Sequence, residues 1–121
     1  MSASPAPQLE MTPRQALNRL ESDLGLTAKD LLGALSVDLR TLDRWLNGET
    51  CPQREARRRL VELLALSQRL CEAFEGPDDA REWLHASSRY LGGITPAEAV
   101  RSGRLDCIEA AFEVLESGIS V

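Results

Sequence analysis

The 121-residue sequence predicts an all-α fold, and three observations support that prediction. Valine, isoleucine and threonine are sparse, and no stretch alternates apolar and polar residues with the period of two expected of a half-buried strand. Apolar residues instead recur three or four positions apart, as they do along one face of a helix. Between these segments stand capping residues, glycines and prolines, which mark where helices begin and end.

The first helix is expected to begin after Thr12. Thr12 and Gln15 have the spacing of a capping box, and Pro13 takes the first helical position, where its missing N–H costs nothing. Gly25 ends the helix, because glycine readily adopts the left-handed conformation of a C-terminal cap. The apolar face consists of Ala16, Leu17, Leu20 and Leu24.

Two short helices follow. Thr27 caps the first of them, with Asp30 near its positively polarised end, and Ser36-Val37 form the turn that follows. Asp38 caps the other, which ends at Asn47-Gly48. The apolar positions of the pair are Ala28, Leu31, Leu32 and Leu35, then Leu39, Leu42, Trp45 and Leu46.

A fourth helix is expected to start at Pro52 and to run to Phe74. Its first turns are basic, and its later part is apolar on more than one side. That apolar set is too wide for one stripe facing one core, so the helix packs either on both halves of the protein or on a second copy of itself. The set is Leu60, Val61, Leu63, Leu64, Ala65, Leu66, Leu70, Cys71 and Phe74.

Three more helices complete the prediction. Gly76-Pro77 opens one with acidic residues in its first turn, and Thr95-Pro96 opens a short one by the capping pattern seen at the first helix. The last helix spans about residues 105–117, and Gly118 occupies the position of its left-handed cap. Its apolar face is Leu105, Ile108, Phe112 and Leu115.

Composition excludes several classes of protein. No apolar run approaches the length of about 18 residues that a membrane span needs, and residues 1–10 lack the parts of a signal peptide, so we expect a disordered arm there. Three widely spaced cysteines fit neither a disulfide framework nor a zinc site, and reduced thiols in the cytoplasm explain them. His85, the only histidine, is expected on the surface of the fifth helix. The sequence has no metal-ligand spacing, no nucleophile motif and no phosphate-binding loop. We therefore expect no metal, no cofactor and no enzymatic activity.

Charge is uneven along the chain, whose net charge is −5. Residues 1–75 hold ten Lys or Arg against eleven Asp or Glu, whereas residues 76–121 hold four against eight. Six arginines fall within residues 40–59, beside three acidic residues. The acidic total argues against nucleic-acid binding by the whole chain, so any contact with DNA belongs in that window.

Residues 27–48 have the layout of a helix-turn-helix. The window resembles the Cro/repressor-like (Xre) type in Val37 after the turn, Asp38 at the cap, the run 39–46 and the stop at Gly48. Such motifs place the start of the second helix in the major groove, and nearby arginines contact phosphate. The resemblance therefore implies DNA contacts at Thr27, Arg40, Thr41, Asp43, Arg44 and Asn47, with phosphate contacts at Arg54, Arg57 and Arg58.

Two positions depart from that type. Leu32 stands where a small alanine is common at the contact between the helices, and Ser36 stands where glycine is common in the turn. A bulkier contact can change the crossing angle of the helices. The alternative is therefore a degenerate helix-turn-helix that serves as a dimerisation scaffold.

A second resemblance lies in the C-terminal half. The pattern is Trp83-Leu84, then Leu91-Gly92-Gly93-Ile94-Thr95-Pro96-Ala97-Glu98, then Gly103 and Gly118. It is similar to the C-terminal toxin-binding domain of the Xre/MbcA/ParS antitoxins over about residues 76–118. The resemblance implies an antitoxin of a RES-domain toxin, an enzyme similar to ADP-ribosyltransferases that degrades NAD. The domain docks on the toxin, and the chain end approaches the NAD cleft.

The implied toxin contacts form two groups. The terminal carboxylate and serines beyond a glycine are suited to mimic the anionic cofactor, and the acidic surplus of this half suits a basic partner. The first group is Trp83, Leu91, Gly92, Gly93, Thr95 and Pro96, and the second is Glu113, Glu116, Ser117, Gly118, Ile119, Ser120 and Val121.

The chain is thus expected to divide into an arm (1–10), an Xre-like helix-turn-helix domain with a linker helix (11–75) and a small helical toxin-binding domain (76–121). The expected function is an antitoxin that inhibits the toxin and represses its own operon on operator DNA. A homodimer suits two half-sites one helical turn apart, and it would form higher hetero-oligomers with the toxin. The alternative is a stand-alone transcriptional regulator whose C-terminal half only oligomerises.

Overall fold

The computed structural model describes residues 11–117. The expected arm at residues 1–10 and the expected cap at Gly118 lie outside the described residues. Within 11–117 the chain forms seven α-helices and no strand, which confirms the all-α prediction. The helices are α1 (Pro13–Leu24), α2 (Ala28–Leu35), α3 (Leu39–Leu46), α4 (Arg54–Ala73), α5 (Pro77–Leu84), α6 (Pro96–Arg101) and α7 (Leu105–Glu116).

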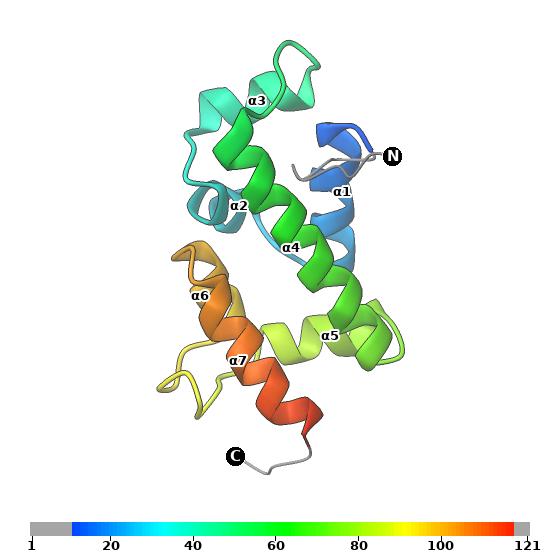
Figure 1. Ribbon diagram of the computed structural model, residues 1–121, viewed down its shortest axis with the longest axis vertical. Coiled ribbons are helices and arrows are strands. Elements are labelled where there is room, and N and C mark those ends of the chain that lie inside the picture. Colours follow the sequence, from blue (N-terminus) through cyan, green and yellow to red (C-terminus); the bar gives the residue numbers. More distant parts are fainter. Residues whose placement is uncertain (1–10, 118–121) are drawn as a thin grey trace, which may run out of the picture.

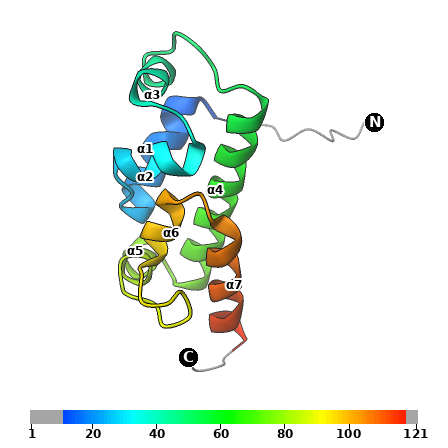
Figure 2. The same ribbon diagram turned by 90° about the vertical axis from the view of Figure 1, so that its left-hand side faces the viewer.

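The long helix α4 organises the other six (Figure 1). Helices α1, α2 and α3 gather around its first half, and α5, α6 and α7 lie toward its second half. Turning the view shows α3 at one end of an elongated molecule and α7 at the other (Figure 2). Since α4 contacts α1 and α2 as well as α5 and α7, it packs on both halves of the protein, one of the two arrangements expected for it.

Side-chain caps begin several helices where the sequence places them. Thr12, Thr27 and Thr95 each accept a hydrogen bond from the backbone three residues on, and each takes part in a complete capping box. Asp38 caps α3 in the same way without the reciprocal bond. These local signals explain why the starts of α1, α2, α3 and α6 were predictable.

Three expectations about the helices are wrong. The fourth helix begins at Arg54 and not at Pro52, because residue 53 is still extended and the ring of Pro52 is buried. Ala28 is exposed in the first turn of α2, where Asp30 turns inward in its place. Leu115 is 42% exposed, since the face of α7 that packs inward includes Ala111.

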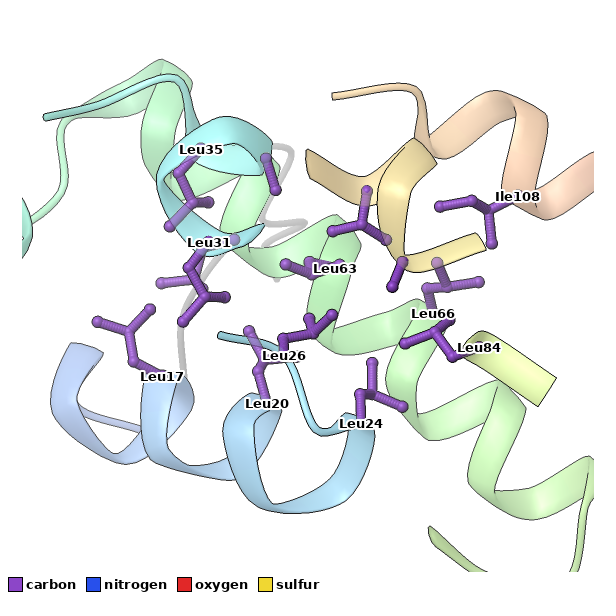
Figure 3. Close-up of a cluster of buried hydrophobic side chains, with 14 of the residues drawn as sticks. Leu17, Leu20, Leu24, Leu26, Leu31, Leu35, Leu63, Leu66, Leu84 and Ile108 are labelled. Atoms are coloured by element: carbon purple, nitrogen blue, oxygen red, sulfur yellow. The ribbon is translucent and has the colours of Figure 1, made fainter. Parts of the chain in front are cut away.

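One hydrophobic core runs through the whole described part of the molecule. Leu63 and Leu66 of α4 lie between leucines of α1 and α2 on one side and Leu84 and Ile108 on the other (Figure 3). All four of these side chains are at most 1% exposed. Fully burying a leucine contributes about 1.5–3 kcal/mol, so this shared core stabilises both halves together.

Candidate binding surfaces

The face of α3 that points away from the core is polar apart from its first residue, Leu39, which is 54% exposed. Leu42 and Trp45 are 3% and 4% exposed and hold the helix on the rest of the protein. Residues spaced three and four apart share one face of a helix, so the polar side chains form a continuous surface. Exposed on it are Arg40, Asp43, Arg44 and Asn47, with Thr41 half-buried at its edge.

The turn before α3 fixes the direction of that surface. Ser36 has φ 59° and ψ 45°, a left-handed conformation, which explains why glycine is common at this position of the motif. The Thr41 N–H then donates to Asp38 Oδ1 at 2.9 Å. Hydrogen bonds from the hydroxyl and the backbone of Thr41 hold the pKa of Asp38 below its ordinary value, so the cap stays ionised at neutral pH.

The arginines at the start of α4 fall into two sets. Glu55 Oε2 lies 2.5 Å from an Arg58 guanidinium nitrogen and 3.1 Å from Arg59 Nε, and Arg58 also pairs with Glu62 at 2.8 Å. Hydrogen bonds from Arg58 and Arg59 lower the pKa of Glu55 to about 2. Arg54 and Arg57 are exposed and make no ion pair within residues 11–117. The predicted phosphate contact at Arg58 thus competes with carboxylates, whereas the other two do not.

The segment between α5 and α6 forms a closed loop. The Ser88 N–H donates to the Ile94 carbonyl at 2.9 Å, and the Gly93 N–H donates to the Ser88 carbonyl at 2.8 Å. Gly92 has φ 78° and Gly93 has φ 98°, backbone angles that residues other than glycine rarely adopt. The glycine pair predicted to bind the toxin therefore has a structural role in shaping this loop.

A groove lies between this loop, α6 and the first half of α7. Its volume is about 320 Å³. Tyr90 and Ile94 on its rim are 48% and 42% exposed, although both are large and largely apolar. Exposed apolar groups gathered at one place mark a surface for a partner. The lining consists of Tyr90, Leu91, Ile94, Ala99, Arg104, Asp106, Cys107 and Ala110.

The predicted contacts on α7 continue from this groove. Asp106, Ala110 and Glu113 are four and three residues apart, so they follow one face of the helix. Glu113, Glu116 and Ser117 are exposed. The structure therefore brings Leu91 and Glu113 to one continuous surface, while the predicted contacts at Gly118, Ile119, Ser120 and Val121 lie outside the described residues.

Trp83 and Pro96 are placed differently from the rest of the predicted set. Trp83 is half-buried, and its ring centroid lies 5.9 Å from that of Phe74 and 6.1 Å from that of Phe112. Arg69 lies over the Phe112 ring and reaches Glu116 at 3.4 Å. Pro96 is buried at the start of α6. Trp83 therefore packs in a cluster of aromatic rings, and Pro96 is part of the buried side of α6.

Sequence reasoning identified only Leu91 among the groove residues and missed Tyr90, Ile94, Ala99, Arg104, Asp106, Cys107 and Ala110. The available signal was the position of Tyr90 and Ile94 on either side of Leu91-Gly92-Gly93, where a loop carries large apolar side chains. It also missed the contact made by His85, which is exposed as expected but donates from Nε2 to the Leu24 carbonyl at 3.0 Å. That contact ties the end of α5 to the end of α1.

Residues 11–117 lack two further kinds of feature. No group of His, Cys, Asp and Glu side chains there is arranged to hold a metal ion. No helix in the same range combines the length and apolar character needed to cross a membrane.

Comparison with known proteins gives a consistent set of relatives. The mycobacterial cidal antitoxin MbcA of Mycobacterium tuberculosis and that of Mycobacterium bovis are each 31% identical over 98 residues, which cover 81% of this chain and 86% of theirs. A chain of the crystal structure of the M. tuberculosis MbcT–MbcA toxin–antitoxin complex is similar in fold, with a TM-score of 0.63 and 28% identity. That likeness covers 89% of this chain and 96% of the other. No profile of a known protein family matches the chain.

Proposed function

The chain belongs to the family of the antitoxin MbcA, and from that premise we propose that it neutralises a NAD-degrading RES-domain toxin. The observation that supports this most is the groove beside α7, where Tyr90 and Ile94 remain exposed. Apolar anchors surrounded by a polar rim suit a protein partner. The relative in the solved complex is an antitoxin with its toxin, which supports a partner of that kind.

In this proposal the groove docks on the toxin, and α7 directs the end of the chain toward the toxin's NAD cleft. Tyr90 and Ile94 provide the apolar anchors, and the acidic side chains of Asp106, Glu113 and Glu116 steer the surface toward a basic partner. The helix then carries residues 117–121 toward the NAD cleft of the toxin. There the serine hydroxyls of this segment contact groups of the toxin that otherwise hold the cofactor.

Co-expression with the protein encoded by the neighbouring reading frame tests this function. Co-purification reports docking, and cellular NAD reports inhibition. We expect the full chain to co-purify and to preserve NAD. A chain truncated after Glu116 should still co-purify but let NAD fall, because the groove is intact and the tail is gone.

A groove variant separates docking from inhibition. Tyr90→Ser with Ile94→Ser should abolish co-purification, because it removes both exposed anchors. The matched control is Leu39→Ser, which changes a leucine that is 54% exposed at the other end of the molecule. Equal protection by full and truncated chains would leave docking alone as the mechanism. Failure of the unaltered chain to co-purify would favour the stand-alone regulator.

We also propose that the α3 surface binds operator DNA and represses the operon, with residues 11–75 forming the DNA-binding part and 76–121 the toxin-binding part. Arg40 and Arg44 lie one turn apart on the exposed face, as base contacts require. A homodimer would supply two such helices for two half-sites, and higher assemblies with the toxin would follow.

Retardation of the chain's own promoter fragment tests the DNA proposal. Arg40→Ala with Arg44→Ala should abolish specific binding, since each good base contact discriminates by about 1–3 kcal/mol. Arg14→Ala with Arg89→Ala removes the same charge from other exposed sites and should leave retardation unchanged. Unchanged retardation in the first pair would favour the degenerate scaffold.

A further inference from the structure

The backbones of α2 and α6 touch. A Cβ atom built on Gly33 would lie 1.9 Å from the carbonyl oxygen of Arg101 and 2.8 Å from its carbonyl carbon. Neither atom belongs to a flexible side chain, so any larger residue at position 33 must push the two helices apart. Glycine within a helix costs about 1 kcal/mol relative to alanine, and close approach of a second backbone is a reason for its presence here.

A buried carboxylate joins the same two helices. Asp30 is only 2% exposed, and both of its oxygens are engaged. Oδ1 accepts from Arg101 Nε at 2.9 Å, and Oδ2 accepts from the Thr27 N–H at 3.0 Å. One side chain thus completes the cap of α2 and holds the last residue of α6. A buried carboxylate that lost Arg101 would keep its desolvation cost without its charged partner.

The position of α6 determines the shape of the docking groove. The glycine loop runs directly into α6 at Thr95, and Ala99 of α6 forms part of the groove lining. With six residues, α6 has too few internal hydrogen bonds to hold its own place. Its apolar side chains are buried against the rest of the molecule, and α2 is among the helices it contacts.

We propose that α2, the first helix of the helix-turn-helix, is the platform on which the toxin-docking groove is built. Gly33, Asp30 and Arg101 are its positioning residues. That the partner of the groove is a toxin rests on the function proposed above. That α2 positions the groove does not depend on that function. A groove resting on α2 also couples the two surfaces, since a partner that shifts α6 shifts the helix that precedes α3.

Nuclear magnetic resonance of the full chain tests the positioning without any partner. In Gly33→Ala and in Arg101→Gln, the backbone amide signals of Gly92 and Gly93 should move, although both glycines lie outside the substituted helices. Arg101→Lys should restore them in large part, because an ammonium group still reaches Asp30. Lys29→Ala, an exposed change on α2, should leave them in place.

Affinity for the co-purified toxin is the second readout. We expect it to fall about fivefold or more in Gly33→Ala and Arg101→Gln, and to recover in Arg101→Lys. If Gly33→Ala fails to fold, Arg101→Gln still tests the inference. The Arg101 side chain is 53% exposed, so we expect its replacement to leave the protein folded. If the Gly92 and Gly93 signals move in the variants but the unaltered chain binds no toxin, the positioning of the groove by α2 is supported and the proposed function is contradicted. Loop signals identical to those of the unaltered chain in both variants would overturn the inference.

Discussion

The two ends of the molecule are held together by different means. At the α3 end, α1, α2 and α3 each begin with a side chain that caps the helix. At the other end, only α6 begins with such a cap, at Thr95, whereas α5 and α7 begin without one. Contacts from the first half secure α5 in its place, where Arg81 bonds the Ser22 carbonyl at 2.5 Å and His85 bonds the Leu24 carbonyl. The helix starts of the first region are thus encoded locally, whereas α5 and α7 of the second region take their places from contacts with other helices.

The two ends also differ in the chemistry of their exposed side chains. Around α3 the exposed side chains are mostly charged or polar, with four arginines free of ion pairs within residues 11–117: Arg40, Arg44, Arg54 and Arg57. Around the α5–α6 loop, large apolar groups stand exposed beside acidic ones. The first chemistry suits phosphate, and the second suits a protein with a basic surface.

The largest expected effect comes from breaking the shared core. Leu63 is fully buried on α4 between the two regions, so Leu63→Ala should cost about 2–5 kcal/mol of the free energy of unfolding. Leu64→Ala, a half-buried neighbour, should cost less. The two tryptophans report each end separately, with Trp45 in α3 and Trp83 in α5. In each single-tryptophan protein, W45F and W83F, the urea transition followed by fluorescence should coincide with the one followed by helical circular dichroism, with and without the core substitution. Separate transitions would mean that the ends are independent.

Two turn substitutions, one at each end, should change the free energy of unfolding by a smaller amount. The change should be a gain at one end and a loss at the other. Ser36→Gly relieves a left-handed serine and should stabilise the protein by about 1 kcal/mol. Gly93→Ala forces alanine to adopt a positive φ of 98° and should destabilise the protein by about 1–2 kcal/mol. Urea unfolding measures both, and a gain in stability from Gly93→Ala would show that the loop tolerates another conformation.

The smallest expected effect is a pH dependence at the α3 cap. The pKa of Asp38 is lowered in the folded protein, so its contribution to stability is present above its ordinary value of 3.8. That contribution is lost as pH falls through the lowered pKa. Asp38→Asn keeps a capping side chain that does not titrate. The difference in free energy of unfolding between the two proteins should therefore change only below about pH 4. A difference that changes near neutral pH would contradict the cap assignment.

Local chemistry explains how much of this fold was predictable. Capping boxes at Thr12, Thr27 and Thr95 and the cap at Asp38 placed four helix starts correctly. The error at Pro52 arose because proline both precedes and opens helices. Periodicity assigned Ala28 and Leu115 to buried faces, but burial at the first and last turns of a helix depends on what packs there.

Contacts between distant residues were not predictable in the same way. Gly33 gave no sign of its contact with Arg101, because a glycine inside a helical pattern has many explanations. The groove had a partial signal in its glycine pair. Its exposed rim depended on the distance between the α5–α6 loop and α7, which is set by packing on α2 and α4.

Hydrogen exchange of the chain with and without its co-purified toxin tests the central claim most directly. The account predicts that backbone amides of residues 88–95 and of α7 become protected in the complex, and more strongly than those of α3. Protection confined to α1, α3 or α4, with residues 88–95 unchanged, would contradict the assignment of the groove as the docking surface.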